Sequence, residues 1–166
     1  MTKTLRILFL ACGLAAAGPQ SGPQPGIPAP AFSLPDLFHT RGDVSLKSLE
    51  GKVVLVDFWA SWCPPCRKTV PDLARMRGRN PSLVVLALSI DEDRAKAVAF
   101  LKSRDTGLIY LHDAKRAAAA EFDLGGMPSA YLIDRRGVLR NRFDGYTESE
   151  MDKMETEVKK LIGEKP

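Results

Sequence analysis

Residues that commonly build metal sites are scarce in this sequence, because its 166 residues include only three cysteines and two histidines. A structural zinc site needs four ligands. His39 and His112 stand far apart in the chain, which contains neither a His-x-His pattern nor a second Cys-x-x-Cys pattern. We therefore expect no bound metal, and nothing in the sequence indicates a cofactor.

A dense run of basic residues is also absent. Lys and Arg outnumber Asp and Glu by only 24 to 20, for a net charge of +4, and no basic cluster is interleaved with aromatic residues. This composition argues against nucleic-acid binding. The length fits one domain, and the 45% of hydrophobic residues is enough for an ordinary core. We expect a single-domain monomer.

The N-terminal segment also contains no long hydrophobic run. Residues 1–17 contain two basic residues, a short apolar stretch and then small residues, which is the layout of a secretory signal. The apolar stretch falls short of the roughly 20 residues of a membrane span. We expect cleavage after Ala17. Two alternatives are lipidation at Cys12, where FLAC resembles a bacterial lipobox despite Phe9, and an uncleaved anchor. Each places the protein in the periplasm or on the outer face of the cytoplasmic membrane, where disulfides persist.

The rest of the chain divides into a Pro/Gly-rich linker over residues 18–30 and a folded domain over residues 31–166. Hydrophobic patterns and turn residues predict strands and helices in an order that indicates an α/β sandwich, with a central mixed sheet, flanking helices and extra N-terminal strands. The expected strands are Ala31–Leu34, Val44–Leu46, Lys52–Ala60, Ser82–Ile90, Leu108–Leu111, Ser129–Asp134 and Val138–Phe143. The expected helices are Pro65–Arg77 with a kink at Pro71, one capped by Asp91 or Asp93, Ala114–Phe122 and Glu148–Ile162.

Cys63 and Cys66 are separated by two prolines and lie where a buried strand gives way to a helix. A disulfide across two residues closes a very small loop and adds little stability, so a purely structural staple is disfavoured. A helix start favours the thiolate of Cys63. That thiolate would attack a substrate disulfide, and Cys66, one helical turn on, would resolve the mixed disulfide. The alternative is a copper metallochaperone that binds Cu(I) through both thiolates.

Asp57 is the one carboxylate inside the apolar strand sequence VLVDFW. A central strand with apolar neighbours leaves no exposed face for it, and burial without a cation raises the pKa of a carboxyl group. Such a group suits proton exchange with the thiol of Cys66. The simpler interpretation is that the strand twists and Asp57 meets water or a lysine.

Several segments together resemble the thioredoxin superfamily, and within it the exported, membrane-tethered oxidoreductases of the TlpA/ResA type. These are VDFWASWCPPC with Pro71 five residues after Cys66, GGMP followed by SAYLID, and FSLPDL…VSLKSLEGK. The resemblance covers the chain from about Ala31 onward. It implies a thioredoxin-like fold, a protein-disulfide oxidoreductase activity, a proton-transfer role for Asp57 and a cis peptide bond at Pro128. It also implies exported disulfide-containing substrates, as in cytochrome c maturation, and a membrane electron donor of the thiol–disulfide relay type.

The residues around the cysteines predict how a substrate is bound and which way electrons flow. Trp62, Pro64, Pro65 and Met127 would form an apolar surround, and Pro128 would present the backbone of residue 127 to an extended peptide. The two prolines lack backbone N–H groups, so two donors to the Cys63 sulfur are missing. A weakly stabilised thiolate favours a reductant, and we therefore expect a reductase.

Overall fold

The computed structural model describes residues 22–101 and 107–164. The expected signal or anchor over residues 1–17, with Cys12, lies outside these ranges, as does the start of the linker. Within the described ranges, no helix is long and apolar enough to cross a membrane.

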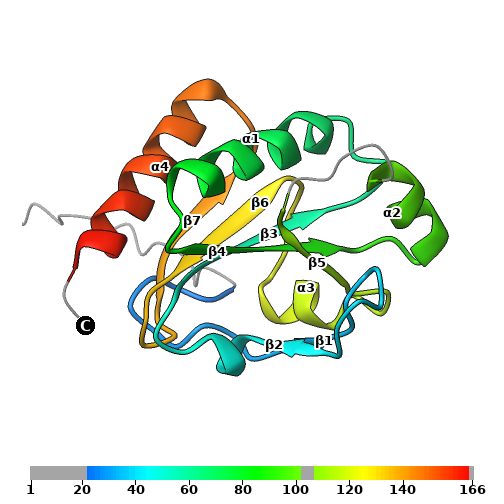
Figure 1. Ribbon diagram of the computed structural model, residues 1–166, viewed down its shortest axis with the longest axis horizontal. Coiled ribbons are helices and arrows are strands. Elements are labelled where there is room, and N and C mark those ends of the chain that lie inside the picture. The colour runs from blue at the N-terminus through cyan, green and yellow to red at the C-terminus, as the bar shows by residue number, and fades with distance from the viewer. Residues whose placement is uncertain (1–21, 102–106, 165–166) are drawn as a thin grey trace, which may run out of the picture.

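A five-stranded mixed sheet forms the centre of the molecule (Figure 1). Its three strands β3, β4 and β5 run parallel to one another, whereas β6 and β7 are antiparallel to their neighbours. The spatial order is β5 (Ile109–His112), β4 (Leu83–Ser89), β3 (Val53–Trp59), β6 (Ser129–Ile133) and β7 (Leu139–Asp144). This arrangement confirms the thioredoxin-like fold class expected from the sequence.

Helices and a small strand pair cover the two faces of this sheet. In Figure 1, α1 (Cys66–Arg79) and α4 (Glu148–Gly163) lie on one face, and α3 (Ala117–Glu121) lies on the other face with β1 (Ser33–Leu34) and β2 (Val44–Ser45). The remaining helix, α2 (Arg94–Leu101), follows β4. The helix α1 continues through Pro71.

Hydrogen bonds correct the end of one predicted strand, which was expected to include Leu46, and decide between the two predicted caps of α2. Leu46 begins a short 3-10 helix, η1 (Leu46–Leu49), because the Ser45 hydroxyl accepts a hydrogen bond from the Ser48 amide at 3.2 Å. Asp93, and not Asp91, caps α2, because its carboxylate accepts a hydrogen bond from the Ala95 amide at 2.8 Å. Asp91 is buried and is bound elsewhere.

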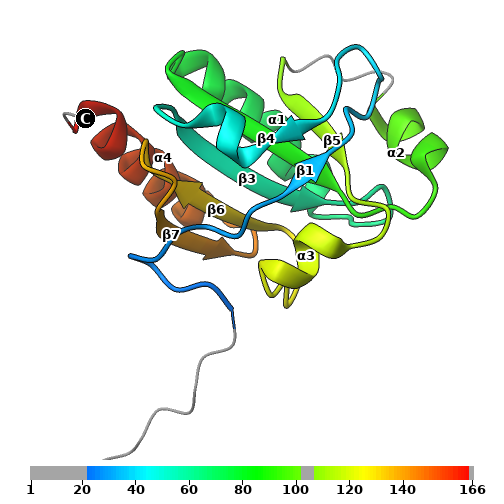
Figure 2. The ribbon, with the colours of Figure 1, turned by 90° about the horizontal axis from the view of Figure 1, so that it is seen from below.

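The second half of the expected linker is part of the fold. The amides of Gly26 and Ala29 donate hydrogen bonds to the carbonyls of Leu139 and Gly137, at 2.7 and 2.9 Å, and the Leu139 amide donates to Ile27 at 2.9 Å. Figure 2 shows this segment, in blue, running beside β7 before it enters β1. The domain boundary expected at Ala31 therefore falls within chain that is already bound to the sheet.

The central strand β3 lies entirely within the core. All seven of its residues are buried, as expected for a strand that is covered on both faces. Phe58 packs against the rings of Phe122 and Tyr131 at centroid separations of 5.5 and 5.8 Å. The strand therefore holds the cysteine segment that follows it on a rigid support.

Candidate active site

Cys63 and Cys66 form a disulfide at the end of β3. The Cys63 amide donates to the carbonyl of Ala60 at 3.1 Å, which closes a tight turn, and Cys66 is the first residue of α1. Their Cα atoms are 5.4 Å apart. Cys66 is fully buried, whereas 4% of the surface of Cys63 is exposed to solvent. A reacting partner can therefore reach Cys63 before Cys66.

An open groove of about 350 Å³ lies against Cys63. The structure brings four of the predicted substrate-binding residues to its wall, namely Trp62, Pro64, Pro65 and Met127. Trp62 is 57% exposed, which excludes the alternative that it packs in the core. The lining also includes residues that the sequence analysis did not single out: Ile90, Leu124, Gly125 and Gly126. Of these, the two glycines belong to the GGMP segment that carried the resemblance, whereas Ile90 and Leu124 carried no distinguishing signal.

Pro128 follows Met127 but is not part of the groove lining. It is buried, and its peptide bond to Met127 is cis, as the resemblance implied. The next residue, Ser129, anchors this bend, because its hydroxyl lies 2.9 Å from the Gly126 carbonyl and 2.7 Å from a carboxylate oxygen of Asp144. The end of β7 thus fixes the loop that forms one wall of the groove.

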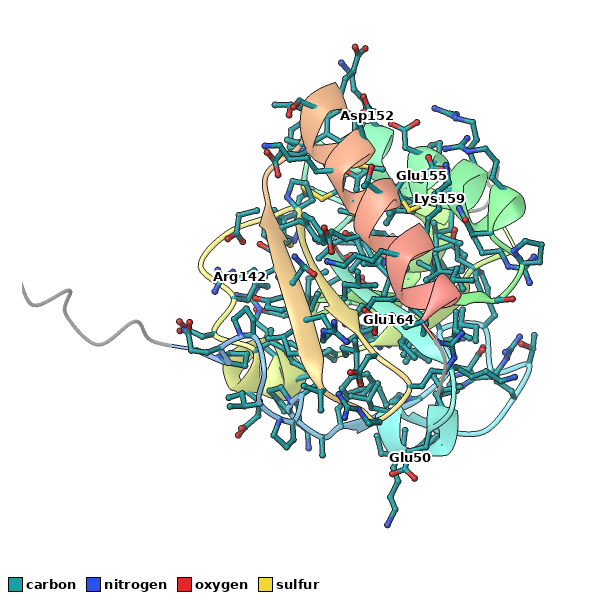
Figure 3. The ribbon with its side chains drawn as sticks, turned by 90° about the vertical axis from the view of Figure 1, so that its left-hand side faces the viewer. Glu50, Arg142, Asp152, Glu155, Lys159 and Glu164 are labelled. Carbon is teal, nitrogen blue, oxygen red and sulfur yellow. A yellow bond between two sulfur atoms is a disulfide. The ribbon has the colours of Figure 1, made fainter. Side chains whose placement is uncertain are left out.

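A charge pair at the sheet edge secures the same loop from outside. Arg142 donates to both carboxylate oxygens of Asp144, at 3.0 and 2.8 Å, and its guanidinium lies 5.5 Å from the centroid of the Tyr131 ring. Figure 3 shows Arg142 beside β7, near the loop that precedes β6. Asp144 therefore has two side-chain partners, Ser129 and Arg142.

Asp57 is fully buried in the middle of β3. Among the described residues, neither of its carboxyl oxygens has a hydrogen-bond partner. Burial raises the pKa of Asp57 well above the ordinary aspartate value, because an anion loses its hydration there without a compensating contact. The structure therefore agrees with the buried carboxyl expected from the sequence and not with an exposed or lysine-paired carboxylate.

The two histidines do not join the cysteines. Among the described residues, no three side chains of His, Cys, Asp and Glu are grouped so that they could hold a metal ion. His112 instead places its Nε2 atom 2.8 Å from the backbone carbonyl of Asp91.

A known protein family shares the sequence pattern of this site. A model of the AhpC/TSA family matches residues 25–142, which include most of the sheet, the cysteine pair and the cis-proline loop. The chain belongs to the AhpC/TSA family. The match covers both walls of the groove.

Relatives within this thioredoxin-like group are named for thiol–disulfide chemistry. The chain is 31% identical to the thiol:disulfide interchange protein DsbE of Allochromatium vinosum, over 89% of this chain and 84% of that one. It is 29% identical to the thiol-disulfide oxidoreductase ResA of Bacillus subtilis, over 68% of this chain and 63% of that one.

A solved structure gives the same answer for the fold. The crystal structure of a putative DsbE from Chlorobium tepidum superimposes with a TM-score of 0.80 at 30% identity, and covers 85% of this chain and 99% of that one. With the Cys63–Cys66 disulfide beside the groove, these relatives identify this member of the AhpC/TSA family as a protein-disulfide oxidoreductase.

Proposed function

We propose that the protein reduces disulfides in exported proteins, with Cys63 as the nucleophile and Cys66 as the resolving thiol. The observation that carries this proposal is the difference in access between the two sulfurs. Cys63 reaches the surface at an apolar groove, whereas Cys66 is completely buried in the first turn of α1. Attack on an external disulfide therefore starts at Cys63.

The reaction uses two exchanges that balance sulfur, protons and electrons. The Cys63 thiolate attacks one sulfur of the substrate disulfide, forms a mixed disulfide and expels the other substrate sulfur as a thiolate. Cys66 then loses its proton and attacks Cys63, which releases the second substrate thiol and leaves the Cys63–Cys66 disulfide. The substrate gains two electrons and the protein loses two.

Asp57 serves as the proton acceptor for Cys66 in this scheme. An aspartate with an ordinary pKa is a weak base toward a thiol, whereas a buried carboxyl with a raised pKa is better matched to it. Because neither Asp57 oxygen has a hydrogen-bond partner among the described residues, its carboxylate form is free to accept the proton that Cys66 loses. Its position in β3, which leads directly into the cysteine turn, supports this role.

The double proline favours electron flow toward the substrate. Pro64 and Pro65 have no backbone N–H, so the first amide after Cys63 that can donate a hydrogen bond to its sulfur is that of Cys66. A thiolate with few donors is stabilised only modestly, which favours a reductant. A thiol–disulfide relay in the membrane would return the protein to its dithiol form.

The groove suits an extended, apolar peptide segment around the substrate cysteine. Trp62, Pro64 and Pro65 form one wall, and Gly125, Gly126 and Met127 form the other. The cis-proline loop offers backbone for strand-like pairing. We propose substrates outside the cytoplasm, such as those of cytochrome c maturation, with the N-terminal residues 1–17 directing export.

Trapping tests the proposal. A Cys66→Ala variant expressed in the native host should accumulate mixed disulfides with substrate proteins on Cys63, and the partners can be identified by mass spectrometry. The Cys63→Ala/Cys66→Ala variant is the control and should trap none. Stoichiometric Cu(I) binding by the reduced protein, with no disulfide reductase activity and no trapped partner, would instead establish the metallochaperone alternative.

A further inference from the structure

Asp91 is a buried carboxylate beside the active site that the proposed chemistry does not use. It is 2% exposed and accepts hydrogen bonds from the Ser61 amide at 2.9 Å and the Ser61 hydroxyl at 2.7 Å. A third hydrogen bond comes from the Ser89 hydroxyl at 2.9 Å. No salt bridge to Asp91 is present among the described residues. Three donors without a cation leave a net negative charge at this position.

Helix capping does not explain this carboxylate. Asp93 supplies the hydrogen bond to the first turn of α2, as described above. Asp91 instead points back toward the end of β3, to a residue 30 positions earlier in the chain. Its function therefore concerns the segment that contains Ser61.

Ser61 belongs to the turn that carries Cys63. The turn is closed by the hydrogen bond from the Cys63 amide to the Ala60 carbonyl, so Ser61 lies within it, two residues before the reactive sulfur. Backbone contacts with the ends of β3 and β5 fix the position of Asp91. Its neighbour Ile90 donates to the Trp59 carbonyl at 3.0 Å and lines the groove, and His112, at the end of β5, contacts the Asp91 carbonyl.

We propose that Asp91 is a positioning residue for thiol–disulfide exchange: it fixes the turn from Ala60 to Cys63, and its negative charge limits the stabilisation of the Cys63 thiolate. This inference rests on the proposed role of Cys63 as the nucleophile. A nearby like charge disfavours a thiolate, and burial protects that effect from screening by salt. The charge therefore acts in the same direction as the two prolines and makes the protein more reducing.

The test measures the reactivity of Cys63 as a function of pH. Each variant is made in the Cys66→Ala background, so that Cys63 is the only reactive cysteine of the pair, and its alkylation by iodoacetamide is followed across the titration. Asp91→Asn removes the charge and keeps the shape. Asp57, Arg67 and His112 remain unchanged in every variant, so their charges do not contribute to the difference.

Asp134→Asn is the matched control. Asp134 is also a buried aspartate, and it also holds a turn, because it accepts hydrogen bonds from the Arg136 and Val138 amides at 2.9 and 3.0 Å. It lies at the opposite end of the sheet, next to Ile133, which pairs with Val54 at the start of β3. Its loss should weaken the fold without changing Cys63.

We expect Asp91→Asn to lower the alkylation midpoint by about one pH unit, so that alkylation below both midpoints becomes about threefold faster, since the larger thiolate fraction outweighs its lower nucleophilicity. Asp134→Asn should leave the midpoint unchanged. An unchanged or raised midpoint in Asp91→Asn, or an equal shift in Asp134→Asn, overturns the inference.

If Asp91→Asn does not fold, Ser61→Ala provides the test. This variant keeps the charge of Asp91 but removes one hydrogen-bond donor to it, so a raised midpoint supports the inference and an unchanged or lowered midpoint overturns it. Failure of Cys63 to alkylate in the parent would instead overturn the proposed function.

Discussion

Asp57 lies opposite Ala130 in the antiparallel pairing of β3 with β6, and on its other side it is paired with Ala87 of β4. The buried carboxyl therefore sits in the central strand between two small residues. Ala130 is two positions after the cis-proline, and the following pair, Phe58 with Ser129, leads to the loop that forms the groove wall. The pairing of β3 with β6 thus connects the proposed proton acceptor to the proposed substrate-binding loop.

The burial of Asp57 predicts how stability depends on pH. Its folded pKa is raised, so the unfolded chain releases this proton first, and stability falls as pH rises above the unfolded value of about 3.9. Asp57→Asn removes this loss. The free energy of unfolding of the variant, relative to the parent, should therefore increase with pH by up to about 1.4 kcal/mol per unit between the two pKa values. Urea denaturation of the oxidised forms at several pH values measures this, and a difference that is independent of pH contradicts it.

Although Asp57→Asn should gain stability relative to the parent as pH rises, it should slow the reaction. Asn cannot accept a proton from Cys66, so resolution of the mixed disulfide should slow by about 100-fold near neutral pH. The first attack by Cys63 should change much less. Rapid-quench analysis with a model disulfide separates the two steps, and a variant that slows both steps equally would show that Asp57 does not act on Cys66.

Exposed Trp62 should contribute to substrate binding and little to folding. Trp62→Ala should change the free energy of unfolding by no more than about 0.5 kcal/mol, since most of the side chain faces solvent. It should raise the KM for a protein substrate and leave the reduction of a small disulfide unchanged. Phe38→Ala is the control, because Phe38 is also exposed, at 40%, but does not line the groove. Equal effects of the two variants on KM would remove Trp62 from the binding site.

Glu155 joins the active-site helix to the C-terminal helix through Arg79. The hydrogen bond from Arg79, with a further one from Lys159, lowers the pKa of Glu155 to about 2 (Figure 3). A depressed pKa contributes stability above the unfolded value of about 4.3, and this contribution is lost as pH falls toward 2. Because Arg79 is 55% exposed, solvent screening limits the effect to about 1 kcal/mol.

Glu155→Gln should therefore be less stable than the parent at pH 7, and the difference should shrink as the pH falls from about 4.3 toward 2. The matched control is Glu157→Gln, since among the described residues Glu157 forms an ion pair only with Lys160, on the same helix, at 3.5 Å. Thermal unfolding followed by circular dichroism measures both variants. If the control lost as much stability as Glu155→Gln, the ion pair between α1 and α4 would contribute no more stability than an ion pair within one helix.

Much of the fold and site was predictable from sequence because the deciding signals are local. The apolar run around Asp57 indicated a fully buried strand, and the Cys63-x-x-Cys66 pair stood where that strand meets a helix. The roles of Asp91 and of the chain around Ile27 were not predictable. Each depends on partners 30 or more residues away, Ser61 and Leu139, and no local pattern distinguishes an aspartate that caps a helix from one that binds a distant turn.

The reduction potential of the Cys63–Cys66 pair tests the central claim most directly. It is measured by equilibrating the protein with defined ratios of reduced and oxidised dithiothreitol or glutathione and quantifying the two forms. A reductase with a weakly stabilised thiolate predicts a value near that of thioredoxin, about −270 mV. A value near the strong oxidants, about −120 mV, would contradict the proposed direction of electron flow.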